Sequence, residues 1–419
     1  MARSIPLNVM DLPGQRYSCH GCGDCCRDFT VQLREEDLER LQSQGYEKKK
    51  GESVTVLFRG QWYLRQQSDG ACIFLESDGR CRIHAEHGFD RKPVACRLFP
   101  FNLAPDARGV HAGLNFACQS VRANKGATLF SHSADLKKAL RELPEITGVA
   151  PPRLSGRLRA TPDEVSAMVE GVDGWLATDD VDLAARFDGL AWLAQSLGVA
   201  NFTNVRNKRV GELMALLVGA LPEELELLPV EEASTRQQRL LRQAAFARIE
   251  DPRIHDGARR NPVVARLGQL RRSRRFMKGK GEVPGLPRDW PTSISFRSIS
   301  EVRSITESDS REEIEDLIIR WARSTLRGGR AWGSGYYGFS VAEGIQCMVV
   351  NLACIGWLAR VHAAGRGLEE VDPEAVNEAL GRVDRTAGRA RWLGSASERM
   401  RLKYFAVDDG LRRVVRLSW

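Results

Sequence analysis

Long apolar runs are scarce in this chain of 419 residues, and their scarcity excludes several classes of protein. The longest apolar stretch covers residues 345–359 and contains Gln346 and Asn351. A bilayer-spanning helix needs about 20 predominantly apolar residues, so we expect a buried core helix there and no membrane span. The first 15 residues hold no apolar run of seven, and Pro6 and Pro13 interrupt them. We therefore expect no secretory signal peptide and a cytoplasmic location.

Several catalytic signatures are also missing. The chain has no H-E-x-x-H motif, no Ser-His-Asp order and no spaced carboxylate pair that would favour hydrolysis. The C-x3-C-x2-C spacing of radical S-adenosylmethionine enzymes is absent as well. Hydrophobic residues make up 42% of the chain and charged residues 28%, which excludes wholesale disorder.

Positive charge is concentrated in one short part of the chain. The net charge is +8, whereas residues 253–288 alone carry eleven basic and two acidic residues, a net of +9. The remainder is nearly neutral, which argues against nucleic-acid binding by the protein as a whole. The predicted helix over residues 262–278 ends in a cluster of Arg271, Arg272, Arg274 and Arg275. We expect a solvated face there, with the docking of an acidic partner as the alternative.

Ten cysteines are present, and eight of them lie in the first 118 residues. In a reducing cytoplasm, dense cysteine more often binds metal than forms disulfides. Cys19, Cys22 and Cys25 have the C-x2-C-x2-C spacing with which ferredoxins hold an iron–sulfur cluster, but the Cys-Pro that should follow is absent. Cys26 follows Cys25 directly, so we expect the two thiols either to ligate different metal centres or to leave one thiol spare.

A predicted hairpin gives a second argument for more than one metal centre. Asp78-Gly79 is typical of a two-residue turn, which would pair Cys81 with Glu76 and leave Cys72 four residues further along. At about 3.3 Å per residue, roughly 13 Å would separate the two thiols, too far for one zinc ion with bonds near 2.3 Å. Two four-thiolate centres would use all eight sulfurs. The argument fails if the loop is longer or if the ladder opens before Cys72.

The secondary-structure patterns divide the chain into two parts. Short strand patterns dominate residues 1–120, with one helix expected over residues 34–44. Beyond them the period is helical, and we expect helices over residues 133–143, 162–177, 181–197, 208–221, 233–249, 262–278, 310–326, 340–364 and 373–393. Residues 279–291, rich in glycine and proline, are the expected break. The sequence thus predicts an α+β fold, in which a small metal-stabilised cysteine-rich domain with short β-hairpins (1–120) precedes a mainly α-helical domain (121–419).

The order of the cysteines and their neighbours resembles a known family. The YkgJ-type cysteine-cluster proteins share the pattern of Cys19-x2-Cys22-Gly23-x-Cys25-Cys26-Arg27, Cys72-x-Phe74-Leu75, Cys81-x-Ile83, Pro93-x2-Cys96-Arg97 and Cys118. These proteins are described as carrying a zinc- or iron-chelating domain, and some are labelled flagellin lysine N-methylase. The resemblance covers about residues 15–120. It departs at His84, where the family has Tyr, and at Lys92, where Arg is usual.

The resemblance implies a set of metal ligands, namely Cys19, Cys22, Cys25, Cys26, Cys72, Cys81, Cys96 and Cys118. The metal would be zinc or iron, including iron in an iron–sulfur cluster. One implied activity is lysine N-methylation of a protein substrate with S-adenosylmethionine as cofactor. The alternative function is a structural zinc domain on a helical interaction module that docks an acidic partner through residues 262–280. Four nearby histidines could substitute as ligands, although we favour surface or hydrogen-bonding roles for His20, His84, His87 and His111.

Three further features are weaker signals. Gly333-Ser-Gly335-Tyr-Tyr-Gly338 fits the G-x-G-x-x-G pattern, but a predicted helix precedes it, so we interpret it as a glycine-rich loop between helices. Cys347 and Cys354 are seven residues apart on an apolar helix, and we expect both to be small core residues. Arginines adjoin three of the eight cysteines and are expected to offset the negative charge of the thiolates: Arg27, Arg82 and Arg97.

Overall fold

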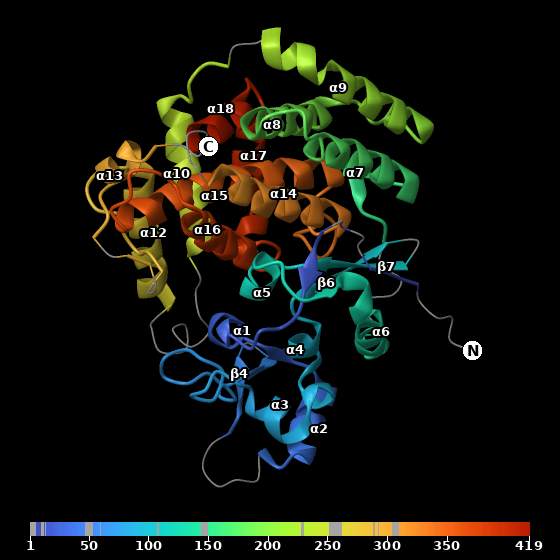
Figure 1. Cartoon of the computed structure of the whole chain (residues 1–419), viewed down its shortest axis with the longest axis vertical. Coiled ribbons are helices and arrows are strands. Elements are labelled where there is room, and N and C mark those ends of the chain that lie inside the picture. Colours follow the sequence, from blue (N-terminus) through green and yellow to red (C-terminus); the bar gives the residue numbers. More distant parts are fainter. Residues whose placement is uncertain are drawn as a thin grey trace.

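The computed structural model describes residues 6–419 except residues 10, 11, 13, 47–52, 59, 107, 108, 144–149, 228, 229, 251–261, 288, 289, 292 and 304–309. The cysteine-rich segment forms a lobe at one end of the molecule, and the helices form a larger body at the other (Figure 1). The predicted α+β fold is confirmed.

The lobe is built from short elements, which are β2 (Arg16–Tyr17), α1 (Asp24–Asp28), β3 (Gln32–Leu33), α2 (Glu35–Ser43), β4 (Thr55–Phe58), β5 (Gln61–Leu64), α3 (Arg82–His87), η2 (Phe89–Arg91) and α4 (Val94–Leu98). The predicted helix over residues 34–44 is confirmed as α2. The strands β3, β5 and β4 form an antiparallel sheet in that order, with Phe58 opposite Gln61. A cluster of buried side chains that includes Leu41, Phe74 and Ile83 is the core of this lobe.

A second sheet lies where the lobe meets the body (Figure 1). Its strands are β1 (Leu7–Val9), β6 (Phe101–Asp106) and β7 (Gly109–Leu114), and β7 pairs with β1 in parallel and with β6 antiparallel. The sequence pattern did not indicate the β6–β7 hairpin, because Pro105 and Gly113 are residue types depleted in strands. After it come α5 (Gln119–Arg122), β8 (Ala127–Thr128), η3 (Leu129–His132), α6 (Ser133–Arg141), β9 (Arg153–Ser155) and β10 (Leu158–Arg159).

The body consists of α7 (Pro162–Leu176), α8 (Leu183–Val199), α9 (Lys208–Leu227), α10 (Thr235–Ile249), α12 (Pro262–Lys278), α13 (Phe296–Glu301), α14 (Arg311–Arg327), α15 (Val341–Gly365), α16 (Pro373–Thr386), η6 (Arg391–Gly394), α17 (Ala396–Phe405) and α18 (Gly410–Ser418). The helices predicted between residues 133 and 364 are confirmed within two residues, except that the helix expected to end at residue 221 continues through Pro222 to Leu227. The helix expected to reach residue 393 ends at Thr386, because Gly388 adopts a left-handed φ of 76°. The short helices α17 and α18 were not predicted.

Helix α15 is the centre of the body. It is long and apolar enough to cross a membrane by length and composition, but 94% of its most apolar window is buried inside the molecule. Helices α8, α10, α16 and α18 pack around it (Figure 1). The prediction of a buried core helix is therefore confirmed, and Cys347 and Cys354 are buried within it.

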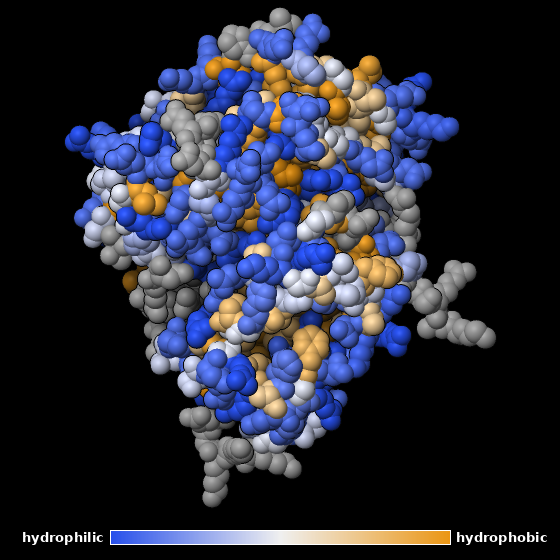
Figure 2. Space-filling view, in the orientation of Figure 1, coloured by the Kyte–Doolittle hydropathy of each residue, from blue (hydrophilic) through white to orange (hydrophobic). Residues whose placement is uncertain are grey.

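The largest hydrophobic core joins the body to residues near the start of the chain. It includes Tyr17, Phe101, Leu114 and Phe116 together with the side chains of the helices. The domain boundary at residue 120 stays a prediction. On the face in Figure 2, hydrophilic residues predominate and hydrophobic ones occur in small groups, as expected when most apolar side chains lie in such cores.

Candidate metal centre

Two glycines bend the backbone that carries the first four cysteines. Gly21 and Gly23 have left-handed φ values of 70° and 77°, and Gly23 caps the start of α1, which carries Cys25 and Cys26. A Cβ atom on Gly23 would stand 2.7 Å from the Nη1 atom of Arg27 and 3.3 Å from the backbone oxygen of Gly79. Glycine is therefore required where α1 packs against the loop that precedes α3.

That loop differs from the predicted hairpin. Cys81 lies opposite Leu75 and not Glu76, and Cys72 lies opposite Gln66. The Leu75 N–H donates to the Cys72 carbonyl at 2.9 Å, which forms a turn where the ladder was expected. The predicted register was wrong because the loop is longer than two residues, and the roughly 13 Å separation that followed from it does not hold.

Four cysteines gather around the lobe core. The Cys72 N–H donates to the Cys26 carbonyl at 2.7 Å, and Cys26, Cys72 and Cys81 all pack in the lobe core cluster. Cys96 lies on α4, where burial raises the pKa of its thiol and the thiolates of Cys72 and Cys81 raise it further, although Lys92 opposes them. Burial also raises the pKa of Cys72 to about 11.

The other cysteines gather around Tyr17. Strand β2 pairs with β8, and the His20 N–H donates to the Ser120 hydroxyl at 3.2 Å, which brings the first two cysteines toward Cys118 at the start of α5. Burial raises the pKa of Tyr17, and the charges of four cysteines add to that effect: Cys118, Cys19, Cys25 and Cys22.

Cys25 and Cys26 lie where the two groups meet. A hydrogen bond between the two thiols, followed by burial, raises the pKa of Cys25. The charge of Cys25 contributes to raising the pKa of Cys22 in the Tyr17 group and of Cys72 in the lobe-core group. Cys25 is thus near both groups, whereas Cys26 packs with the lobe core.

All ten cysteines are free in this structure. Within the described ranges, no three His, Cys, Asp or Glu side chains stand close enough to hold a metal ion as they are placed. The donor chemistry nevertheless fits zinc or iron. The chain brings eight thiols from separate segments together in two neighbouring groups, and thiolates are ligands that both metals accept. Ligation would require the sulfurs of each group to draw closer together.

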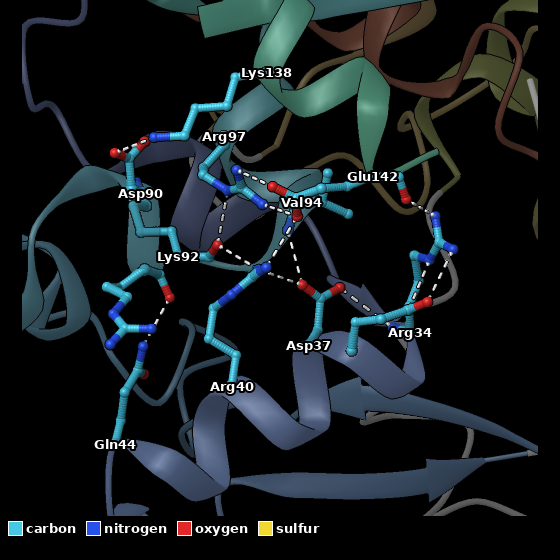
Figure 3. A network of polar contacts seen from close by, with 12 residues as sticks. Arg34, Asp37, Arg40, Gln44, Asp90, Lys92, Val94, Arg97, Lys138 and Glu142 are labelled. Carbon is cyan, nitrogen blue, oxygen red and sulfur yellow. Dashed lines mark hydrogen bonds and ion pairs between the residues drawn. The ribbon is translucent and has the colours of Figure 1, made fainter. Parts of the chain in front are cut away.

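The predicted role of Arg97 beside the thiolates is contradicted by its contacts (Figure 3). Its guanidinium donates to the Glu142 carboxylate at 2.9 and 2.5 Å and to the Lys92 carbonyl at 3.0 Å. Arg40 on α2 donates to the same carboxylate at 2.9 Å. Arg97 therefore ties α4 to the end of α6 and to α2, and Glu142 neutralises its charge.

Lys92 faces the thiols, although in the sequence it stands out only as a departure from the family pattern. Burial alone would lower the pKa of Lys92, but the negative charges of four cysteines outweigh burial and raise it: Cys96, Cys81, Cys25 and Cys26. The sequence feature that could have identified Lys92 as this cation is its position four residues before Cys96. Of the predicted cations, Arg27 donates to the Cys22 carbonyl at 3.4 Å, and Arg82 lies over the Phe74 ring at 5.3 Å.

The four nearby histidines have other surroundings. The His84 ring lies edge-on to Phe89 with centroids 5.8 Å apart, and the His87 ring lies edge-on to Tyr46 at 5.6 Å. His111 is on β7, on the wall of a cavity that no cysteine lines. His20 contacts Ser120 through its backbone N–H, and the His20 residue itself is exposed.

The basic cluster on α12 is divided between two roles. Arg272 is half-buried and forms an ion pair with Glu250, so its charge is already used inside the protein. Arg271, Arg274 and Arg275 are exposed, as the predicted solvated face requires.

Comparisons with known proteins bear on the cysteine lobe. Residues 18–123 match the CxxCxxCC family model, which is described as a "Putative zinc- or iron-chelating domain". A protein of Methanocaldococcus jannaschii, named only as uncharacterized, is 31% identical over 90 residues. That match covers 21% of this chain and 30% of the relative, so the chain spans less than a third of the relative's length. No solved structure matches the chain. Residues 18–123 therefore form a metal-binding cysteine domain of the CxxCxxCC type.

Proposed function

We propose that the cysteine lobe holds two metal ions, zinc or iron, in two four-thiolate centres. Centre A consists of Cys19, Cys22, Cys25 and Cys118, and centre B consists of Cys26, Cys72, Cys81 and Cys96. The observation that carries the proposal is the division of eight free thiols into one group around Tyr17 and another in the lobe core.

The assignment of the adjacent pair rests on their separate contacts. Cys26 packs in the lobe core and its carbonyl accepts from the Cys72 N–H, which supports its place in centre B. The charge of Cys25 acts on Tyr17 and Cys22 but also on Cys72 and Cys96, so we place Cys25 in centre A because centre B already has four thiols. Neighbouring residues on a helix point about 100° apart, so each thiol can bind its own ion once the hydrogen bond between Cys25 and Cys26 is broken.

The charges also support two centres. Four thiolates on a divalent ion leave a net charge of −2, so each centre needs a nearby cation. Lys92 would serve centre B, because the negative charges of Cys96 and Cys81 raise its pKa more than those of Cys25 and Cys26 do. Arg27, which donates to the Cys22 carbonyl, would serve centre A. Cys19 is exposed whereas Cys72 is buried, so we expect centre A to exchange its metal with solvent chelators faster than centre B.

Metal counting in ligand variants tests the proposal. The full chain is purified without oxygen, and metals are counted by mass spectrometry together with a visible spectrum that distinguishes iron–sulfur clusters from zinc. We expect two metal ions per chain. Cys118→Ser and Cys96→Ser should each retain one ion, and the double variant should retain none. The matched control is Cys354→Ser in the body, which should retain both.

The double variants separate the partition from metal binding itself. Cys19→Ser with Cys118→Ser removes two ligands of centre A, so one ion should remain in centre B. If this variant loses both ions while each single variant loses one, the partition is wrong. If the wild-type chain holds no metal and its eight thiols form disulfides, metal binding by these thiols is wrong.

A protein lysine N-methylase activity is the finer proposal, and its support is the family resemblance. The test incubates the metal-loaded chain with labelled S-adenosylmethionine and lysine-containing proteins. Label transfer that Cys22→Ala abolishes would support the activity, and transfer that survives loss of the metal would contradict its link to the cluster.

Docking of an acidic partner on α12 is the second candidate function. It is supported by the exposed side chains of Leu267 and Leu270, which are 62% and 52% exposed, beside the exposed Arg271, Arg274 and Arg275. Polyglutamate peptide is a suitable probe. Binding should fall in the variant Arg271→Gln with Arg274→Gln and should be unchanged in Arg297→Gln, whose side chain is exposed on α13.

A further inference from the structure

Helix α9 lies at the edge of the body, at the end of the molecule opposite the cysteine lobe (Figure 1). One face packs on α7 and α8, and there the side chains of Val210, Met214 and Leu221 are buried. The other face is exposed from the first turn of the helix to Glu226. Helix α9 therefore has one face that the described part of the chain leaves uncovered.

The uncovered face has the alternating spacing of three and four residues that is typical of a helix paired with a second helix. We name this set of exposed residues the α9 stripe, and its members are Arg209, Glu212, Leu216, Gly219, Glu223 and Glu226. Leu216, at its centre, is 72% exposed. A Cβ atom on Gly219 would meet nothing within 4 Å, so packing within this chain does not require glycine there. Glycine inside a helix is destabilising relative to alanine, but it lets a second backbone approach closely.

The charges of α9 are reversed relative to those that stabilise a helix. Acidic side chains are favourable near a helix N-terminus, and basic side chains are favourable near a C-terminus. Helix α9 instead begins with Lys208 and Arg209, has no acidic residue in its first turn and has no basic residue in its last turn. Its C-terminal part carries Glu223, Glu224 and Glu226. Both groups of charges weaken the helix by itself, and a surface of the opposite polarity would offset this effect.

These charges have no ionic partner within the part of the chain that the structure describes. The Arg209 guanidinium makes one hydrogen bond, which is long at 3.5 Å and goes to the backbone oxygen of Asn204. A guanidinium has five N–H donors, and a neutral oxygen leaves its charge uncompensated, so Arg209 can still pair with a carboxylate. Glu223 and Glu226 are exposed and accept no hydrogen bond from the described residues.

A second copy of α9, running antiparallel, supplies the opposite polarity. Leu216 lies seven residues from Arg209 and seven from Glu223, which is about 10 Å along the helix in each direction. When Leu216 of both copies lies at a twofold axis, Arg209 of each copy faces Glu223 of the other. Glu212 then faces the half-buried Ala220 of the other copy and meets no like charge. A parallel arrangement would bring like charges together at both ends, so the charges select the antiparallel one.

We propose that this protein forms a twofold-symmetric dimer through antiparallel contact between the α9 stripes of two copies. The dimer contact is independent of the proposed metal centres, because the cysteine lobe lies at the other end of the molecule (Figure 1). One helix pair buries a small area, which places the contact among weak interfaces of less than about 1,200 Å². We therefore expect a dimer Kd of about 1–100 μM.

Sedimentation equilibrium of the full chain between about 5 and about 200 μM tests the proposal. The wild type should pass from the mass of one chain to the mass of two. Arg209→Glu and Glu223→Arg each place like charges opposite one another, and each should weaken the dimer at least about tenfold. Both substitutions bring the favourable sign to a helix end, so thermal unfolding should show that neither destabilises the single chain. The double variant, Arg209→Glu with Glu223→Arg, should dimerise again.

Mixing the two single variants is the sharpest arm of the experiment. In a mixed dimer both pairs of charges are again opposite in sign, so an equimolar mixture should dimerise although neither variant does so alone. The matched control is Arg239→Glu, the same change of charge at an exposed residue of α10, which should dimerise like the wild type. The proposal is overturned if the wild type stays a single chain at about 200 μM. It is also overturned if the single variants dimerise like Arg239→Glu, or if neither the double variant nor the mixture recovers the dimer.

Discussion

Replacement of Glu142 by glutamine would test how the lobe holds the helix that carries Cys96. The Glu142 carboxylate follows α6 and accepts hydrogen bonds from Arg97 on α4 and Arg40 on α2 (Figure 3). Glu142→Gln keeps the size of the side chain and removes its charge. The guanidinium of Arg97, only 3% exposed, would then be left without its anion.

The expected cost follows from the burial of the two partners. Removing one partner of a fully buried ion pair costs about 3–5 kcal/mol, whereas exposed pairs contribute about 0–1 kcal/mol. The Glu142 side chain is 33% exposed and Arg97 is buried, so the pair lies between these limits. Arg40 keeps a second anion, Asp37, at 3.1 Å. We therefore expect Glu142→Gln to lower the free energy of unfolding by about 2 kcal/mol.

Urea denaturation of the full metal-loaded chain, followed by release of metal to a chelator, measures this change. The matched control is Lys138→Gln, which breaks the neighbouring pair with Asp90, whose side chains are 53% and 58% exposed. We expect little change there. If Glu142→Gln shifts the urea midpoint no more than Lys138→Gln, the reasoning is wrong. A double-mutant cycle with Arg97→Met that yields no coupling energy would contradict it equally.

The same pair predicts a pH dependence. Hydrogen bonds from Arg97, and then from Arg40, lower the pKa of Glu142 from its ordinary 4.5 even though burial opposes them. A lowered pKa means that the stabilisation is present above pH 4.5 and is lost as the pH falls below it. The difference in stability between wild type and Glu142→Gln should therefore shrink on acidification, as urea midpoints measured from pH 7 to pH 3 would show.

Further variants test the glycine bend, an acidic cap and the last helix. Gly23→Ala should lower the urea midpoint and weaken metal binding more than Gly21→Ala, because both have left-handed φ but a Cβ at Gly21 meets nothing within 4 Å. Burial would raise the pKa of Glu164, but hydrogen bonds lower it to about 2. The ionised Glu164 carboxylate therefore stabilises the fold above pH 4.5, and this stabilisation is lost as the pH falls toward 2. Glu164→Gln should thus lower the urea midpoint at neutral pH and have little effect near pH 2. Asp188→Asn should cost about 3–5 kcal/mol and speed hydrogen exchange in α18, because the guanidinium of Arg412 is fully buried against it.

Local patterns in the sequence predicted much of the fold. The first-turn prolines after Thr161 and Asp372 mark the starts of α7 and α16, where the side chains cap the helices as expected. The bend after Thr386 could not be predicted to end α16, because a single glycine within a helical pattern is usually tolerated. The pairing of β1 with β7 joins residues about a hundred positions apart, which local patterns do not reveal.

The sequence and its family resemblance predict eight cysteine ligands, and that ligand set stays a prediction. Their arrangement could not be predicted, because it depends on tertiary contacts such as the hydrogen bond between the Cys72 N–H and the Cys26 carbonyl. The register error at Cys81 has the same origin, because the Asp78 carboxylate accepts from the Arg80 N–H at 2.9 Å and favours a longer loop. The sequence could not reveal the ion pair between Arg97 and Glu142, because the two residues are 45 positions apart.

The two proposed centres are attached to the protein in different ways, and the attachment determines what each metal would stabilise. Cys118 precedes α5, and the nearby Phe116 N–H donates to the buried carboxylate of Asp384 on α16 at 2.6 Å. Arg122 on α5 hydrogen-bonds to Asn377 on the same helix. Centre A is thus joined to the helical body, whereas three ligands of centre B pack in the separate lobe core. A metal ion that orders the residues around it contributes its binding free energy to the stability of that part of the fold. Loss of centre A should therefore loosen the junction between lobe and body. Loss of centre B should unfold the lobe while the α15 core stays intact.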